Sequence, residues 1–178
     1  MGKVFDAIGP ALEQWILEQP MFFVATAAAT GHVNCSPKGL PGTFAVLDPN
    51  RVAYLDLTGS GVETIAHLAA DGRIVVLLCS FGPKPRIVRL HGTGVVHRLG
   101  TPAYDALAPR FTSYAGARSI IEISLDRISD SCGFGVPVMS MVGERSLLVD
   151  DHAGRGADGL QDYRQQTNAT SIDGFPGW

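Results

Sequence analysis

The sequence predicts one mostly β domain, a small closed antiparallel β-barrel with peripheral helices. Short β-rich runs alternate with tight turns, and the connections among the first four runs are too short for the crossover helix that a parallel pair requires. Only two or three segments have helical periodicity. Because 46% of the 178 residues are hydrophobic and 17% are charged, the chain can bury one sizeable core.

The first half of the chain begins with a predicted helix over residues 4–18, where apolar side chains recur at helical spacing until Pro20. Four predicted strands follow, separated by turn residues. They are residues 21–29, 32–36, 43–47 and 51–57. A second amphipathic helix is predicted over residues 61–70, and Asp71-Gly72 ends it.

The second half contains three more predicted strands and two short helical pieces. The strands are residues 74–81, 86–97 and 119–128, and the helical pieces are 101–107 and 160–166. Residues 74–81 are almost continuously apolar, which is typical of a strand covered on both faces. Gly92 and Gly94 predict a bend or bulge in the next strand. Alternation in 119–128 predicts a strand with one face in water.

Thr58-Gly59-Ser60-Gly61 forms the corner between a strand and the second helix, and it has two interpretations. A helix start offers free N–H groups and the positive end of the helix dipole, so the corner could bind an anion such as phosphate. Alternatively, Ser60 and Glu63 match the S/T-x-x-E capping box, which needs no ligand. The corner lacks the lysine of a P-loop.

Charge and composition exclude several partners. A formal net charge of -3 and a pI near 5.9 indicate binding neither to nucleic acid nor to an anionic membrane. Neither a signal peptide nor a membrane-spanning run is found, so we expect a cytoplasmic protein. Cys35, Cys79 and Cys132 lie far apart and outside any metal motif, which predicts free, mostly buried thiols and no metal site.

Four motifs, VNCSPKG, RVAYLDLTGSGVETIAHL, PRIVRLHGTG and SCGFGVP, resemble in order and spacing the pyridoxamine 5'-phosphate oxidase-like family of FMN-binding split barrels. The resemblance covers residues 22–138. It implies a six-stranded antiparallel split barrel that forms a homodimer, with FMN at the subunit interface; some relatives use the deazaflavin F420 or bind haem. We accordingly expect a single domain over 1–178, with an N-terminal helix (1–20), a barrel core (21–138) and a C-terminal extension (139–178).

The resemblance also implies cofactor-binding positions. Those in the strand VNCSPKG and in the basic strand PRIVRLHGTG are Ser36, Lys38, Arg86 and Arg89. Those at the corner are Asp56, Leu57, Thr58, Gly59, Ser60 and Gly61. The chain departs from true pyridoxamine phosphate oxidases because Glu63-Thr64 replaces their basic pair, and their C-terminal substrate-binding Arg and His have no match. Vitamin B6 oxidation is therefore not expected.

Three functions are considered for these residues: an enzyme, a haem-binding protein and a dimer without catalytic activity. The first is an FMN- or F420-dependent oxidoreductase acting on a small molecule, in which the flavin carries the redox chemistry and no acid or base is identified. The second is a haem-binding protein on the same scaffold, with His91 or His32 as the axial ligand. The third is a structural or flavin-storage dimer. His67 follows Glu63 by one helical turn, which predicts an i,i+4 pair.

Overall fold

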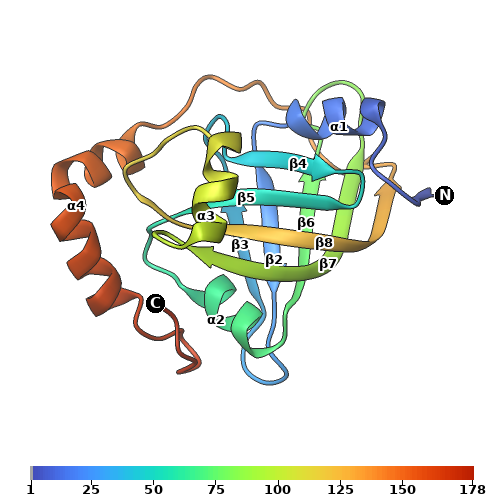
Figure 1. The fold of residues 1–178 in the computed structure, drawn as a ribbon. Helices are drawn as coiled ribbons and strands as arrows, with labels where there is room; N and C mark the ends of the chain where they lie inside the picture. The colour runs from blue at the N-terminus through green and yellow to red at the C-terminus, as the bar shows by residue number, and fades with distance from the viewer. Residues whose placement is uncertain (1) are drawn as a thin grey trace.

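An antiparallel sheet of eight strands forms the centre of the computed structural model, which describes residues 2–178 (Figure 1). The hydrogen-bonded order is β3-β2-β6-β7-β8-β5-β4, and β1 pairs with β8. The strands are β1 (Val4–Phe5), β2 (Phe22–Thr26), β3 (Asn34–Lys38), β4 (Phe44–Asp48), β5 (Arg51–Leu57), β6 (Arg73–Cys79), β7 (Ile87–Arg98) and β8 (Ala117–Ser131). The helices are α1 (Pro10–Leu17), α2 (Glu63–Ala70), α3 (Pro102–Leu107) and α4 (Leu147–Thr167), with a 3-10 turn at Ala108–Arg110.

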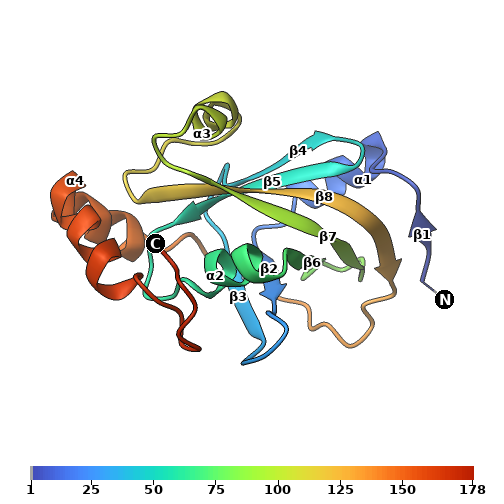
Figure 2. The same ribbon diagram turned by 60° about the horizontal axis from the view of Figure 1, so that its bottom comes forward.

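The sheet folds over on itself, so that β2, β3 and β6 cross the direction of β4, β5 and β8 (Figures 1 and 2). Within residues 2–178 the ladder ends at β3 and β4, so the barrel is split, as the resemblance implies, and the closed barrel predicted from the strand pattern is wrong. The sheet has eight strands and not the six that the resemblance implies. The predicted bend in β7 is confirmed by a shift of register with β8 between His91 and Gly92. Every strand pair is antiparallel, as predicted.

The main hydrophobic core lies between the two halves of the sheet. Helices α1 and α2 cover it from opposite ends (Figure 1). The α1 side contributes Ile8, Leu12 and Ile16, and the α2 side contributes Val62, Ile65 and Leu68. Inward side chains of every second position in β2, β6 and β7 complete it, in accordance with the period of a strand.

The N-terminal helix is shorter than predicted, because Val4 and Phe5 form β1 against β8 and the helix begins at Pro10. Proline suits this first helical position, where its missing N–H has no intrahelical partner. Within residues 2–178, the two faces of residues 74–81 are not both fully covered, although the sequence predicts such coverage. In β6, Ile74, Val76 and Leu78 are buried, whereas Val75 and Leu77 are only half-buried on the other face.

Helix α4 is much longer than the helical piece predicted over 160–166. It extends over 21 residues, with a kink at Gly156, whose φ of 65° lies in the left-handed region. Because most of its residues are polar, apolar periodicity did not predict its full length. Its buried residues are His152, Leu160 and Arg164. The long helix and the tail that follows it lie along the α2 end of the sheet (Figure 2).

Two further sequence expectations can be compared with the described residues. Among them, no helix combines the length and apolar character that a bilayer crossing requires. All three cysteines are free, as predicted, but Cys35 and Cys132 are exposed and only Cys79 is buried. Both exposed thiols lie at positions that face away from the core, so the prediction of mostly buried thiols is wrong.

Candidate functional site

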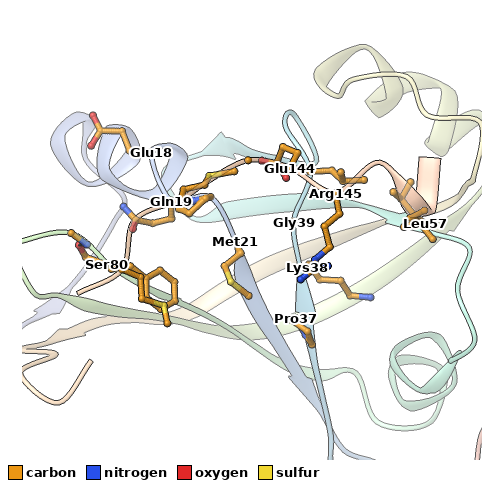
Figure 3. A pocket seen from close by; sticks show the side chains of 18 of the residues that line it. Glu18, Gln19, Met21, Pro37, Lys38, Gly39, Leu57, Ser80, Glu144 and Arg145 are labelled. Carbon is orange, nitrogen blue, oxygen red and sulfur yellow. Dashed lines mark hydrogen bonds between the residues drawn. The ribbon is translucent and has the colours of Figure 1, made fainter. Parts of the chain in front are cut away.

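A cleft of about 1030 Å³ opens where α1, the ends of β3 and β5, the β6–β7 loop and the segment before α4 meet (Figure 3). Its walls are largely apolar. The apolar lining includes Trp15, Met21, Leu55, Leu57, Phe81, Met139, Met141 and Leu148. Volume and lining are those of a pocket for a small molecule or cofactor.

Lys38 lies at the β3 end of the cleft and belongs to a buried charge network. Its Nζ lies 3.4 Å from Oδ1 of Asp56, and Arg118 Nε donates to Oδ2 of the same carboxylate at 2.6 Å. The Asp56 side chain is 1% exposed. Burial raises the pKa of the Asp56 carboxyl, but the charges of Arg118 and Lys38 outweigh it and leave this pKa below its usual value. Asp56 is therefore ionised and holds Lys38 at the cleft and Arg118 behind it.

The Thr58–Gly61 corner is held by residues far away in the sequence. Arg164 Nε donates to Thr58 Oγ1 at 2.8 Å, and His152 Nε2 donates to Thr58 O at 2.8 Å. Asn168 Nδ2 donates to Gly59 O at 2.9 Å, and Arg118 Nη2 donates to Gly61 O at 2.9 Å.

Asn168 Oδ1 in turn accepts from Arg118 Nη1 at 2.8 Å, so the C-terminal extension and the charge network form one unit. The Thr58 N–H is also occupied, since it donates to Gly116 O at 2.8 Å. The conformation of the corner therefore depends on tertiary contacts.

The capping box predicted for this corner is wrong. The N-cap of α2 is Val62, and no side chain caps it. Glu63 Oε1 instead accepts from the Ile172 N–H at 3.3 Å. The predicted pair of Glu63 with His67 is wrong as well, because His67 is buried and its Nδ1 lies 3.1 Å from Thr26 Oγ1. In both cases a contact from a distant segment replaces a local one.

The structure brings four of the predicted cofactor positions together at one cleft. Lys38, Leu57, Thr58 and Gly59 line it. Asp56 lies behind it under Lys38. Their role in cofactor binding stays a prediction, but their common location is a property of the fold.

The other predicted positions do not line this cleft. Ser36 donates to Asn34 Oδ1 on β3, and Ser60 and Gly61 line a separate groove of about 420 Å³ beside His32. Arg86 forms an ion pair with Asp130 at 2.9 Å, and Arg89 Nη1 donates to Ser131 Oγ at 3.1 Å. Both arginines therefore bind the end of β8.

The two histidines considered as haem ligands also lie outside the cleft. The side chain of His32 is 78% exposed, and its Nδ1 lies 2.6 Å from Asp173 Oδ1. His91 is half-buried on β7, and its buried Nδ1 has no hydrogen-bond partner among residues 2–178. No group of three or more potential metal ligands occurs in the described part of the chain.

Sequence reasoning missed four polar residues at or behind the cleft: Arg118, Arg145, Arg164 and Asn168. All belong to β8 or to the C-terminal part of the chain, and none has a motif around it. The one available signal was a basic residue at the start of an otherwise apolar strand, Arg118 before Ile120. A charge in such a position is seldom buried unless it is paired.

The comparisons with known proteins agree with this architecture. The family described as Pyridoxamine 5'-phosphate oxidase matches residues 8–132. Among solved structures, HupZ of Group A Streptococcus has a TM-score of 0.52 at 22% identity, covering 68% of this chain and 91% of that one. A candidate pyridoxamine 5'-phosphate oxidase of Lactobacillus delbrueckii has a TM-score of 0.55 at 19% identity, covering 71% and 98%. These two likenesses concern the fold.

A curated relative extends the similarity into the C-terminal extension. The pyridoxamine 5'-phosphate oxidase family protein ustO of Aspergillus flavus is 40% identical over 192 residues, which span 97% of this chain and 76% of the relative. Since the family match ends at residue 132, the segment before α4 and α4 itself lie beyond it but are largely included in the match to this relative. By its family match and by this relative, the chain belongs to the pyridoxamine 5'-phosphate oxidase family.

Proposed function

We propose that the protein is a flavin-dependent oxidoreductase that binds FMN, or the related deazaflavin F420, in the cleft at the β3 end of the barrel. The observation that carries this proposal is the combination of a largely apolar cleft of about 1030 Å³ with the Lys38 ammonium group at one end. Apolar walls suit a planar ring system, and a cation suits a phosphate or the electron-rich edge of a reduced ring. The family membership supports the same cofactor class.

The residues of the cleft fit such a group. Trp15, Met21 and Phe81 offer surfaces for a ring. Lys38 can donate to an anionic oxygen, because Asp56 is already bound closely by Arg118 at 2.6 Å and lies 3.4 Å from Lys38. Thr58 and Gly59 form the neighbouring wall. Bound flavin would supply the hydride or electron transfer, and the chain would position it and exclude water. The substrate proposed is a small organic molecule.

The proposed assembly is a homodimer through the outer face of β2 and β6. Phe23 lies opposite Leu77, and Ala25 lies opposite Val75, and all four are half-buried apolar residues on one face. No element within residues 2–178 covers this face completely, which is typical of a surface buried by a partner. The proposed compartment is the cytoplasm, where three free cysteines stay reduced.

Haem binding is the second candidate, and one observation favours it. His91 lies on the same outer face as Val75, and its buried Nδ1 has no partner in the described residues. A haem ligated by His91 would occupy that face and not the cleft, because no histidine of the described residues lines the cleft. The two candidates therefore predict ligands in different places.

An absorption spectrum of the purified protein, taken alone and after addition of FMN, F420 or haemin, tests these candidates. Retention of FMN or F420 through gel filtration supports the oxidoreductase. A Soret band that shifts in His91→Ala, with no flavin or F420 retained, supports the haem protein and contradicts the first proposal. A protein that retains none of the three contradicts both.

The Lys38→Ala variant tests the site itself. We expect the dissociation constant of FMN to rise by about tenfold or more, since a charge-assisted contact is lost. Lys3→Ala is the matched control, because Lys3 is exposed and does not line the cleft. Equal FMN affinity in both variants would remove Lys38 from the binding site.

A further inference from the structure

A segment beyond the family match forms one wall of the cleft. Residues 139–148, here called the strap, connect the region after β8 to the start of α4 (Figure 1). The strap is fixed at its beginning, where the Met139 N–H donates to Phe81 O at 2.9 Å. Its members Met139, Met141, Gly143, Glu144, Arg145, Leu147 and Leu148 line the cleft. The strap therefore adds residues from outside the family match to a site whose other walls belong to the matched region.

Arg145 is the cation that the strap adds. Figure 3 shows its side chain entering the cleft on the side where Lys38 lies. No carboxylate of residues 2–178 lies within ion-pair distance of its guanidinium group. A guanidinium group directed into a cleft without a carboxylate partner is suited to bind an anionic group of a ligand in a bidentate manner.

The wall behind this end of the cleft carries surplus positive charge. Lys38 and Arg118 share the single carboxylate of Asp56. Arg164, which is 7% exposed, binds only neutral groups: Thr58 Oγ1, the carbonyl oxygen of Ala117 and, through a cation-π contact, the ring of Trp178. Burial and the charge of Arg118 lower the pKa of Arg164. This wall therefore has three cations, of which Lys38 and Arg118 contact the Asp56 carboxylate and Arg164 does not, and the surplus positive charge attracts an anion to this end of the cleft.

The cleft also contains two acidic residues, Glu18 and Glu144, which lie in different places (Figure 3). Glu18 and Glu144 also line a smaller adjoining cleft of about 330 Å³, which neither Lys38 nor Arg145 lines. Figure 3 shows Glu18 far from Lys38 and Leu57. Glu144 directly precedes Arg145 and lies on the same side of the cleft (Figure 3), and its carboxylate forms no ion pair among residues 2–178. Glu18 is thus remote from Lys38, whereas Glu144 lies on the side of the cleft where Arg145 lies.

We propose that Arg145 of the strap and Lys38 of β3 together bind one phosphate group of a ligand, beside the Thr58–Gly59 wall. The inference rests on the proposed function, and it assigns to the strap a role in selecting phosphorylated ligands. Two sources share this chemistry: the phosphate of the cofactor, or that of a phosphorylated substrate.

Titrations of the full-length protein and of Arg145→Gln with three probes test the proposal. FMN and riboflavin are followed by flavin fluorescence, and inorganic pyrophosphate is followed by calorimetry. The two flavins differ only in the phosphate, so their ratio isolates its contribution. Arg127→Gln is the matched control, because Arg127 is exposed on β8 and does not line the cleft. Lys38→Gln provides the second half of the pair.

If the cofactor supplies the phosphate, FMN affinity falls by about tenfold in Arg145→Gln and Lys38→Gln, and riboflavin affinity stays unchanged. If a substrate supplies it, affinity for both flavins stays unchanged, and pyrophosphate binding is lost in the same two variants. Because pyrophosphate requires no flavin, this arm remains informative even if the protein binds none. Unchanged affinity of Arg145→Gln for all probes, or an equal loss in Arg127→Gln, overturns the proposal.

Discussion

Asp56 is central to the cleft, because its carboxylate is the only one among residues 2–178 that forms ion pairs with Lys38 and Arg118. Removing one partner from a buried ion pair leaves a charge without compensation in a poorly hydrated place. Ser119 Oγ, at 3.2 Å, also donates to the carboxylate, so the acceptor has partners on several sides. Asp56 thus contributes to stability and positions Lys38 at the cleft.

Replacing Asp56 with Asn is therefore expected to lower the free energy of unfolding by about 3–5 kcal/mol. Urea denaturation at neutral pH measures the change. The control is Asp151→Asn, whose carboxylate pairs with Arg155 on the exposed surface of α4, where a loss of about 0–1 kcal/mol is expected. Similar losses in the two variants would contradict a special role of the buried network.

The same carboxylate predicts a pH dependence of stability. The pKa of Asp56 is lower in the folded chain than its ordinary value, so its contribution is fully present above the unfolded pKa of about 3.9 and is lost as pH falls through the folded pKa. Below about pH 4, the unfolding free energy of the wild type should therefore fall more steeply than that of Asp56→Asn. Parallel curves would mean that Asp56 does not titrate as proposed.

Among the elements, β7 shows how a single residue permits a bend that positions the two halves of the sheet. Gly92 lies at the register shift against β8, where a Cβ would collide with the carbonyl oxygen of Ser124. Any side chain would therefore have to displace backbone within the central ladder. The sequence pattern predicted the irregularity, and the structure gives its cause.

Gly92→Ala is accordingly expected to destabilise the protein by about 1–3 kcal/mol through overpacking. Thermal unfolding, supported by urea denaturation, measures it. Gly135→Ala is the control, because a Cβ at Gly135 meets nothing within 4 Å and the expected change is within about 0.5 kcal/mol. A neutral Gly92→Ala would show that the bend does not require glycine.

Helix α4 has its effect on the site through three polar side chains. Within the helix, His152 donates to the carbonyl oxygen of Thr58, and Arg164 donates to its hydroxyl oxygen. Asn168, the C-cap residue, donates to the carbonyl oxygen of Gly59. A helix with few apolar residues is normally stabilised by packing against other elements. In this protein, hydrogen bonds to the Thr58–Gly61 corner hold α4 against the rest of the molecule. They connect the C-terminal extension to the geometry of the cleft.

At the scale of the whole molecule, the half-buried apolar face of β2 and β6 predicts the assembly. Leu77→Glu is expected to convert a dimer into a monomer, because it places a charge at the centre of that face. Light scattering coupled to gel filtration measures the mass. Val95→Glu is the control, since Val95 is 53% exposed on the other half of β7. A monomeric wild type, or a dimeric Leu77→Glu variant, would contradict the prediction.

Much of the fold could be predicted from the sequence, because its signals are local. Seven of the eight strands correspond to predicted runs, and the predicted turn at Asp71-Gly72 ends the second helix where expected. The exception at the start, β1, has two residues and exists only through its pairing with β8. Helix α4 was underestimated because its residues carry little apolar periodicity.

For the site, the sequence by itself placed Lys38 just beyond one predicted strand and the Thr58–Gly59 turn just beyond another, and the family resemblance directed attention to both. Tertiary structure alone decided which groups complete the site. Arg118, Arg145 and Asn168 reach the site from positions 50 or more residues beyond the corner in the chain. Periodicity and turn chemistry depend on residues that are close in the sequence. A buried charge needs a hydrogen-bonded or charged partner, and that partner can come from any part of the chain. For this reason the strands were readable in the sequence, and the charge network was not.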